Sequence, residues 1–146
     1  IALAADLRLT TSDARWSVME ARWGLVPDMG GVHALSQLVR IDVAKRLAMT
    51  GEVVSGTRAV ELGLATEVSE EPFVAATRWL EEVATRSPDA VAETKAAFER
   101  TWSSGARRTF ARERLAQARL LAAGNTRIAR EAALERRTPR FGPRAR

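Results

Sequence analysis

The sequence predicts an α/β fold whose mixed first part is followed by a helical second part. Two observations lead to this prediction. Short alternating segments, separated by turns rich in Gly, Pro and Asp, occupy residues 1–70. Apolar residues at helical spacing then dominate residues 71–146. We therefore expect residues 1–70 to belong to an α/β core and residues 71–146 to form a helical region.

The first part is predicted to alternate strands and helices. Alternation of apolar and polar residues indicates strands, and apolar residues three and four apart indicate helices. Asp42 is predicted to cap the second helix, which should end near Gly51. In chain order, the expected elements are strands over 6–11 and 15–19, a loop over 24–31, helices over 32–39 and 42–51, an extended piece at 53–54, a helix over 55–63 and a strand over 64–68.

The second part is predicted to contain only helices. Ser87 followed by Pro88 is typical of a helix start, with a capping residue and a proline in the first turn. Gly124 and Asn125 are predicted to separate the last two helices, and residues 139–146 to be frayed. The expected helices span 73–86, 88–103, 106–123 and 126–137.

Composition excludes several classes of protein. Apolar residues make up 46% of the 146 residues, which is the range of folded globular chains. No apolar run approaches the ~20 residues that span a bilayer, so we expect no membrane partner. The chain has no cysteine, which excludes disulfides, thiolate nucleophiles and Cys-ligated zinc. A single histidine, His33, leaves no His-rich metal site and no spare imidazole for a relay. We expect a cytoplasmic protein without a bound metal.

The first residues look like the interior of a fold. The chain begins at Ile1, and residues 1–5 are apolar but lack the basic region of a signal peptide. We therefore expect the sequence to be the C-terminal part of a longer protein.

Charge is unevenly distributed along the chain. Residues 1–99 hold 10 Lys/Arg and 15 Asp/Glu, whereas residues 100–146 hold 13 Arg and 3 Glu. The basic end suggests either an anionic partner or a solvated helical face. A nucleic-acid partner is not expected, because this end lacks interleaved aromatic residues and any recognised binding motif.

Two carboxylates are candidates for acid–base chemistry. Glu20 is predicted to end a strand between the apolar residues Met19 and Trp23, and an apolar setting disfavours the charged form of a carboxyl. Asp28 follows eight residues later across a Gly/Pro loop. Two carboxylates in different surroundings can divide the roles of proton donor and acceptor. By itself, such a pair is weak evidence for catalysis, because most carboxylates with this spacing lie on a solvated surface.

Other features near this loop have ordinary structural explanations. Gly30 and Gly31 precede a helix, but they form neither a P-loop nor a dinucleotide fingerprint. A turn that lets the helix pack closely is the favoured interpretation. His33 is expected on the first turn of that helix as a surface or half-buried residue. The four tryptophans are expected to be core or interface anchors.

A series of motifs runs along the chain in a definite order. They are Ala-Ala-Asp-Leu-Arg at 4–8, Asp-Ala-Arg-Trp at 13–16, Glu20, Gly-Leu-Val-Pro at 24–27, Gly-Gly at 30–31, Ala-Lys-Arg-Leu-Ala-Met-Thr-Gly at 44–51, Ala-Val-Glu-Leu-Gly-Leu-Ala at 59–65, and Arg-Glu-Ala at 130–132 followed by Arg-Thr-Pro-Arg-Phe at 137–141. Taken together, they resemble the crotonase superfamily, the enoyl-CoA hydratase/isomerase family. The match covers nearly the whole chain, and the order and spacing of the motifs make it specific.

The resemblance implies a fold and an assembly. It implies that residues 1–70 are the C-terminal portion of a spiral of ββα units. It also implies that residues 71–146 are an α-helical trimerisation region, so that the protein is a homotrimer or a hexamer. The implied substrate is an acyl-CoA thioester, with coenzyme A as part of the substrate rather than a cofactor, and the implied setting is fatty acid metabolism.

The resemblance also implies a mechanism. In the family a thioester enolate is held by two backbone N–H groups, consistent with preorganised donors that stabilise developing charge. Glu20 falls on the second catalytic glutamate of the hydratases. The first glutamate and both oxyanion-hole donors would precede Ile1, so the chain alone is expected to be inactive. Met19, Trp23, Leu25 and Pro27 are the implied substrate-binding residues.

Two further positions follow from the resemblance. Asp28 stands where typical hydratases have Gly and where dienoyl-CoA isomerases have Asp. The pair Glu20 and Asp28 therefore favours double-bond isomerisation over hydration without deciding between them. Arg137 and Phe141 lie where the family's C-terminal helical region can reach the CoA nucleotide, sometimes in a neighbouring subunit. A rival explanation pairs the arginines with the net-negative first part across subunits.

Two other functions are compatible with the sequence. The chain could be a non-catalytic crotonase-fold subunit that binds acyl-CoA or promotes oligomerisation. An Arg-rich nucleic-acid binder is the other alternative, and it would show a steep loss of affinity with salt.

Overall fold

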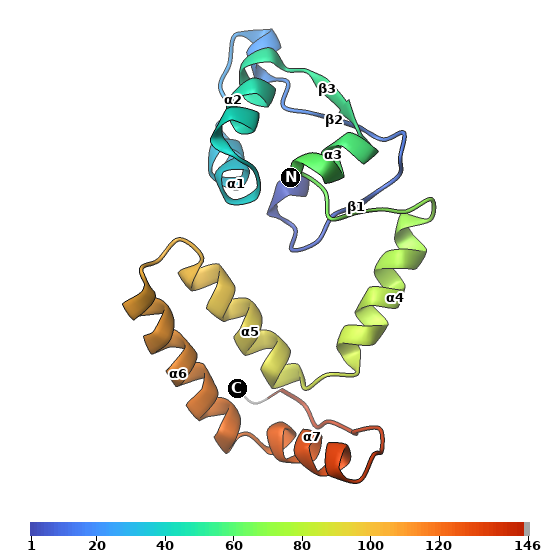
Figure 1. The fold of residues 1–146 in the computed structure, drawn as a ribbon, viewed down its shortest axis with the longest axis vertical. Helices are drawn as coiled ribbons and strands as arrows, with labels where there is room; N and C mark the ends of the chain where they lie inside the picture. Colours follow the sequence, from blue (N-terminus) through green and yellow to red (C-terminus); the bar gives the residue numbers. More distant parts are fainter. Residues whose placement is uncertain (145–146) are drawn as a thin grey trace. The chain divides into compact units, whose positions relative to one another are not determined.

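The computed structural model describes residues 1–144, which divide into two compact units. The first unit spans Ile1–Thr77 and the second spans Arg78–Arg146 (Figure 1). Helix α4, Pro72–Ala84, carries the chain from one unit into the other. Each unit is described below by itself.

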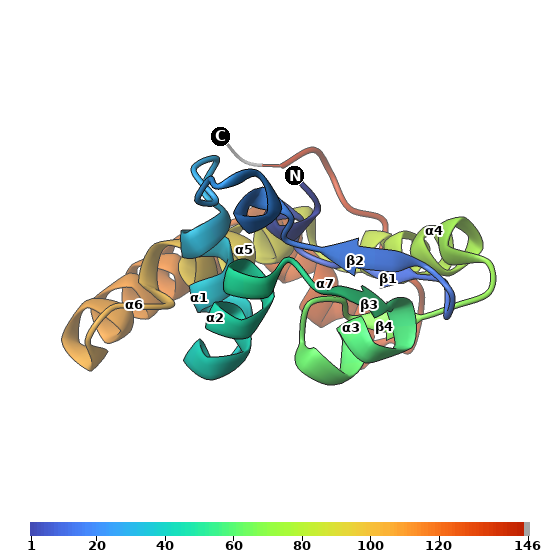
Figure 2. The ribbon, with the colours of Figure 1, turned by 90° about the horizontal axis from the view of Figure 1, so that it is seen from above.

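The first unit contains two small two-stranded sheets among short helices (Figure 2). Strand β1 pairs with β4 in parallel, and β2 pairs with β3 in antiparallel register with Trp16 opposite Val54. In chain order the elements are η1 (Ala2–Ala4), β1 (Leu9–Thr10), β2 (Arg15–Ser17), η2 (Glu20–Trp23), α1 (Gly31–Leu38), α2 (Ile41–Thr50), β3 (Val53–Ser55), α3 (Gly56–Leu62) and β4 (Glu67–Val68).

The core of this unit lies between α1, α2, α3 and β3. Six buried apolar residues form it, and Leu35 and Leu47 are the largest side chains that are fully enclosed. Trp16 packs against the core and donates a hydrogen bond from Nε1 to Thr10 Oγ1 at 3.0 Å, which links the two sheets. The core residues are Leu35, Leu47, Val54, Ala59, Leu64 and Ala65.

Two predicted strands are much shorter than expected, and Arg8 explains why. Residues 6–11 contribute only Leu9–Thr10 to a strand, and residues 64–68 contribute only Glu67–Val68. The Arg8 side chain donates to the carbonyls of Leu64 and Ala5, both at 2.6 Å. These carbonyls are thereby satisfied by a side chain instead of a strand ladder. Burial lowers the pKa of this guanidinium below its usual value, because desolvation penalises its charge.

The start of α3 depends on the absence of a side chain at Gly56. A Cβ there would lie 1.8 Å from the carbonyl oxygen of Thr11, far inside contact distance. Ser55 caps the helix by accepting a hydrogen bond from the Arg58 N–H at 3.1 Å. Close approach and cap together hold α3 against the loop after β1.

The predicted cap at Asp42 is wrong. Helix α2 begins at Ile41, and its N-cap is Arg40, which makes no side-chain cap. The Asp42 carboxylate instead forms an ion pair with the Arg40 guanidinium at 3.0 Å. Asp42 still lies in the first turn, where a negative charge favours the helix dipole.

The second unit is helical, as predicted. Helix α5 spans Pro88–Thr101, α6 spans Ala106–Ala122 and α7 spans Gly124–Leu134, and α5 packs along α6. The predicted start of α5 is confirmed, because Ser87 accepts from the Ala90 N–H at 3.4 Å and Pro88 occupies the first turn. The expected break at Gly124 and Asn125 is wrong. It lies at Ala123, whose extended backbone separates α6 from α7.

Asn125 anchors the segment that follows α7. Its Nδ2 donates to Asp89 Oδ2 at 2.8 Å and to the Gly142 carbonyl at 3.2 Å, and its Oδ1 accepts from the Gly142 N–H at 2.9 Å. The expected fraying of residues 139–146 is therefore wrong for the described part, while residues 145 and 146 lie outside the described residues. Over residues 1–144, no helix is both long and apolar enough to cross a membrane.

Candidate functional site

Glu20 lies at the start of a short helix, not at the end of a strand as predicted. Strand β2 ends at Ser17, and the single-turn helix η2 begins at Glu20. Gly24 closes that turn in the left-handed region at φ 71°, and the Leu25 N–H donates to the Glu20 carbonyl at 3.0 Å. The expected strand ends early because β3 offers only Val53–Ser55 as partners.

The base of this turn is held by the end of helix α2. The Ser17 hydroxyl donates to the Gly51 carbonyl at 3.2 Å. Arg22 lies over the same glycine, because a Cβ at position 51 would be 2.9 Å from Arg22 Cγ. The buried position of Gly51 and its φ of 61° leave little room for any other residue. Gly51, at the end of helix α2, thus helps to position the turn η2 that begins at Glu20.

The carboxylates of Glu20 and Asp28 have no partner among residues 1–144. Glu20 is half-buried and Asp28 is exposed, and neither carboxylate makes a hydrogen bond or ion pair within the part of the chain that the structure describes. Asp28 lies in the turn before α1, where Gly30 adopts φ 77° and Pro27 contacts Gly31. Both carboxylates come from one continuous segment.

The predicted apolar enclosure of Glu20 is not formed by Met19 and Trp23. Met19 is 43% exposed and Trp23 is 78% exposed, so neither side chain shields the carboxyl from water. We call the exposed apolar residues of this segment the loop patch. Its members are Trp23, Leu25, Val26, Met29 and Val32, each more than 60% exposed.

The loop patch includes residues that the sequence analysis did not single out. Val26, Met29 and Val32 belong to it in addition to the implied substrate-binding residues Trp23 and Leu25. Pro27 is half-buried, because it packs on Gly31. Five exposed apolar side chains within residues 23–32 are typical of a binding or interaction surface. In the sequence, the run of apolar residues on both sides of Gly24 was the signal that could have predicted this patch.

The remaining candidates, His33 and three of the tryptophans, lie on different elements of the two units. His33 is exposed on the first turn of α1, as predicted, and its carbonyl accepts from the Ser36 hydroxyl at 2.7 Å. Trp16 packs on the core, whereas Trp79 and Trp102 are 46% and 65% exposed. Trp102 contacts Phe98 with ring centroids 5.9 Å apart.

Arg137 and Phe141 lie in the second unit, after α7. Arg137 is exposed and pairs with Glu135, and Phe141 is half-buried. The chain reverses between them and α7 through Arg136, whose φ of 53° is unusual for a residue other than glycine. Both residues therefore belong to a segment that the Asn125 hydrogen bonds hold in place.

Comparison with known proteins identifies the family. The family model described as enoyl-CoA hydratase/isomerase matches residues 1–144. The human mitochondrial enoyl-CoA hydratase domain-containing protein 2 is 31% identical over 147 residues, covering 97% of this chain and 50% of that protein. A short-chain-enoyl-CoA hydratase of Clostridium acetobutylicum is 32% identical over 102 residues, covering 68% of this chain and 39% of that protein. The chain belongs to the enoyl-CoA hydratase/isomerase family.

Solved structures agree with this assignment. A probable enoyl-CoA hydratase/isomerase from Mycobacterium abscessus matches with a TM-score of 0.90 at 30% identity, over 97% of this chain and 57% of that one. The predicted α/β, crotonase-like fold is thereby confirmed. The chain spans half or less of the length of the human and clostridial relatives.

Proposed function

We propose that this chain forms part of an enzyme that acts on an acyl-CoA thioester. The reaction is hydration of a 2-enoyl-CoA or migration of its double bond, through an enolate stabilised at the thioester oxygen. The observation that carries the proposal is the Glu20 carboxylate, which has no partner among the described residues and is followed by the loop patch. Membership of the hydratase/isomerase family supports the same chemistry.

In this proposal Glu20 transfers the proton. For hydration, its carboxylate accepts a proton from water as the water oxygen bonds to C3 of the enoyl group. The protonated Glu20 then gives this proton to C2 as the enolate collapses, which restores the carboxylate. Met19, Trp23, Leu25 and Pro27 hold the acyl chain. Apolar side chains that are exposed in this chain would bury surface against such a ligand, which favours binding.

Asp28 extends the proposal to isomerisation. A carboxylate eight residues after Glu20, with no partner among residues 1–144, can take the proton role at the far end of a conjugated system. The two carboxylates differ in burial, since Glu20 is half-buried and Asp28 exposed. This difference supports separate donor and acceptor roles.

The proposal also covers assembly and the nucleotide end of the substrate. Large aromatic side chains on α4, α5 and α6 are exposed, and apolar surface of this kind supports a homotrimer or hexamer built by the helical region 71–146. Arg137 and Phe141 would contact the CoA nucleotide. The exposed aromatics of this region are Phe73, Trp79, Phe98, Trp102 and Phe110.

We further propose that the 146-residue chain is inactive by itself. Stabilising the enolate charge takes preorganised donors, and the chain spans half or less of the length of the human and clostridial relatives. If a longer form of the protein also fails to turn over 2-enoyl-CoA but still binds it, a non-catalytic acyl-CoA-binding or oligomerisation subunit is the better description. Location stays a prediction, since the human relative is mitochondrial.

Replacing Asp28 with Asn should separate the two reactions. We expect the variant to lose at least about 100-fold in double-bond migration, the usual effect of removing a general acid or base. Hydration should change by less than about threefold, because Glu20 serves that reaction. The measurement compares the two rates on a dienoyl-CoA and on a 2-enoyl-CoA, using a form of the protein that is active.

A matched control is Asp42→Asn, which removes an exposed carboxylate that pairs with Arg40 outside the proposed site. It should leave both rates unchanged. If Asp28→Asn alters neither rate, Asp28 has no role in proton transfer and the isomerase part of the proposal fails.

A further inference from the structure

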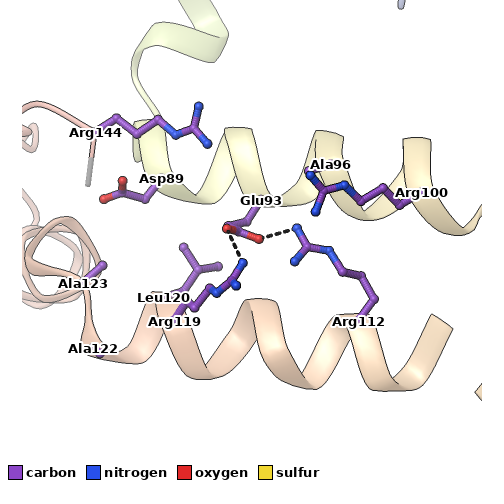
Figure 3. A pocket seen from close by; sticks show the side chains of 10 residues that line it. All are labelled: Asp89, Glu93, Ala96, Arg100, Arg112, Arg119, Leu120, Ala122, Ala123 and Arg144. Atoms are coloured by element: carbon purple, nitrogen blue, oxygen red, sulfur yellow. Dashed lines mark hydrogen bonds and ion pairs between the residues drawn. The ribbon is translucent and has the colours of Figure 1, made fainter. Parts of the chain in front are cut away.

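A charged cavity lies within the second unit, between helices α5 and α6 and the segment after α7 (Figure 3). Its volume is about 600 Å³, enough for a small organic anion. The lining combines four guanidinium groups with two carboxylates. The charged residues are Arg100, Arg112, Arg119, Arg144, Asp89 and Glu93. The formal charge of this lining is therefore positive by two.

Arg112 is buried in the cavity wall and is only partly satisfied. Its side chain is 10% exposed, and its Nη2 donates a hydrogen bond to Glu93 Oε2 at 2.6 Å. Its Nε is buried and has no hydrogen-bond partner among residues 1–144. A buried donor without an acceptor is destabilising. The Nη1 group, by contrast, is not buried and makes no hydrogen bond among residues 1–144, so a ligand oxygen can reach it.

Glu93 acts as the counter-ion inside the cavity. It is 18% exposed and lies between two guanidinium groups, with Arg112 at 2.6 Å and Arg119 at 3.6 Å (Figure 3). The single carboxylate is thus shared by two cations of the same helix face, since positions 112 and 119 are two turns apart. An incoming anion would meet two neighbouring guanidinium groups whose two positive charges are balanced by only one carboxylate.

The segment after α7 forms one wall of the cavity, and hydrogen bonds from Asn125 hold this segment in place. The Asn125 amide binds Asp89 Oδ2 at 2.8 Å from the α5 side, and it binds both the N–H and the carbonyl of Gly142. Arg144 follows two residues later and lines the cavity. The fourth guanidinium therefore comes from a segment that Asn125 anchors through hydrogen bonds with Gly142 and Pro143.

We propose that this cavity binds a phosphate group, with Arg112 as its central ligand and Glu93 as an exchangeable internal counter-ion. An esterified phosphate group carries on average about −1.5 to −2 charges at pH 7, which is close to the excess charge of the lining. The planar guanidinium fork bonds phosphate oxygens in pairs, and the Nη1 group of Arg112, which makes no hydrogen bond among residues 1–144, is the donor that remains open. The proposal concerns the second unit alone and stands independently of the Glu20 reaction.

The test is a titration of the phosphate-free chain with inorganic phosphate and, separately, with glycerol 2-phosphate at constant ionic strength. Isothermal titration calorimetry should show saturable binding of at least one of them to a single site. Tighter binding of the ester would identify an esterified phosphate as the source of the group, and tighter binding of inorganic phosphate would identify the free ion. No saturable heat with either probe would overturn the proposal.

Two variants test the assignment of residues. Arg112→Gln should weaken binding by roughly tenfold or more, the effect of losing a charge-assisted hydrogen bond. Glu93→Gln should tighten binding by at least about threefold, because the competing carboxylate is removed while its volume is kept. If the ion pairs of Glu93 have only a structural role, Glu93→Gln should bring no gain in affinity for phosphate.

The control is Arg114→Gln, which removes an exposed arginine of the same helix outside the cavity. Its affinity for phosphate should equal that of the unmodified chain. A loss equal to that of Arg112→Gln would show that general surface charge, not the cavity, attracts the anion. If Arg112→Gln does not fold, the sign of the Glu93→Gln effect decides the question, and unchanged or weaker binding there rejects the site.

Discussion

Replacing Glu20 with Gln should lower the turnover of a 2-enoyl-CoA by about 10²- to 10⁴-fold, the usual contribution of a positioned acid or base. Gln keeps the size of the side chain but neither accepts nor releases a proton near pH 7. The half-buried position and the η2 turn are compatible with an amide of the same shape. KM should change little, because the proposed CoA contacts at Arg137 and Phe141 are not altered. An unchanged KM with a lowered kcat marks an interaction specific to the transition state.

The measurement follows the loss of enoyl-thioester absorbance in a form of the protein that hydrates this substrate. Glu67→Gln is the matched control, because Glu67 is an exposed glutamate of β4 away from the η2 turn, and its turnover should equal that of the unmodified protein. Unchanged turnover of Glu20→Gln would remove Glu20 from the mechanism. A raised KM with normal kcat would instead assign Glu20 to substrate binding.

Replacing Leu47 with Ala should destabilise the first unit by about 2–5 kcal/mol, which is the range for truncating a buried leucine. Leu47 is completely enclosed, and it packs in the cluster that also holds Leu35 and Val54. The surrounding elements are anchored by close contacts such as that of Gly56 with Thr11, so the cavity cannot collapse easily. Because small domains are stable by about 5–15 kcal/mol, this loss is a large share of the total.

Urea unfolding followed by circular dichroism measures the effect on the chain. Met49→Ala on the same helix is the matched control, because Met49 is 75% exposed and loses little contact on truncation. The control should change the free energy of unfolding by less than about 0.5 kcal/mol. A similar effect of the two substitutions would show that α2 does not pack through Leu47 in solution.

Helices were predicted better than strands, and the reason is physical. A helix satisfies its backbone from its own residues, so the apolar spacing and the cap at Ser87 sufficed to predict α5. A strand depends on its partner, and β1 has only Glu67 and Val68 to pair with. The predicted strands were therefore too long, because no local pattern reveals that the Arg8 side chain occupies the neighbouring carbonyls.

The candidate site shows the same division. The order and spacing of the motifs from residues 4–8 to 137–141 predicted the family, and the family comparison confirmed it. The surroundings of Glu20 were not predicted correctly. Flanking apolar residues suggested enclosure, yet Trp23 is largely exposed because η2 turns its side chain to solvent.

The sequence by itself determined the family, the α/β character of the first part and the helical character of the second, since these depend on local periodicity and on motifs in order. Only the tertiary structure decided which side chains share one space. It anchored the segment after α7 through Asn125, and it gathered Glu93, Arg112 and Arg119 around one cavity. Such groupings arise from the packing of α5 on α6, which joins residues about twenty positions apart and leaves no trace in any short stretch of sequence.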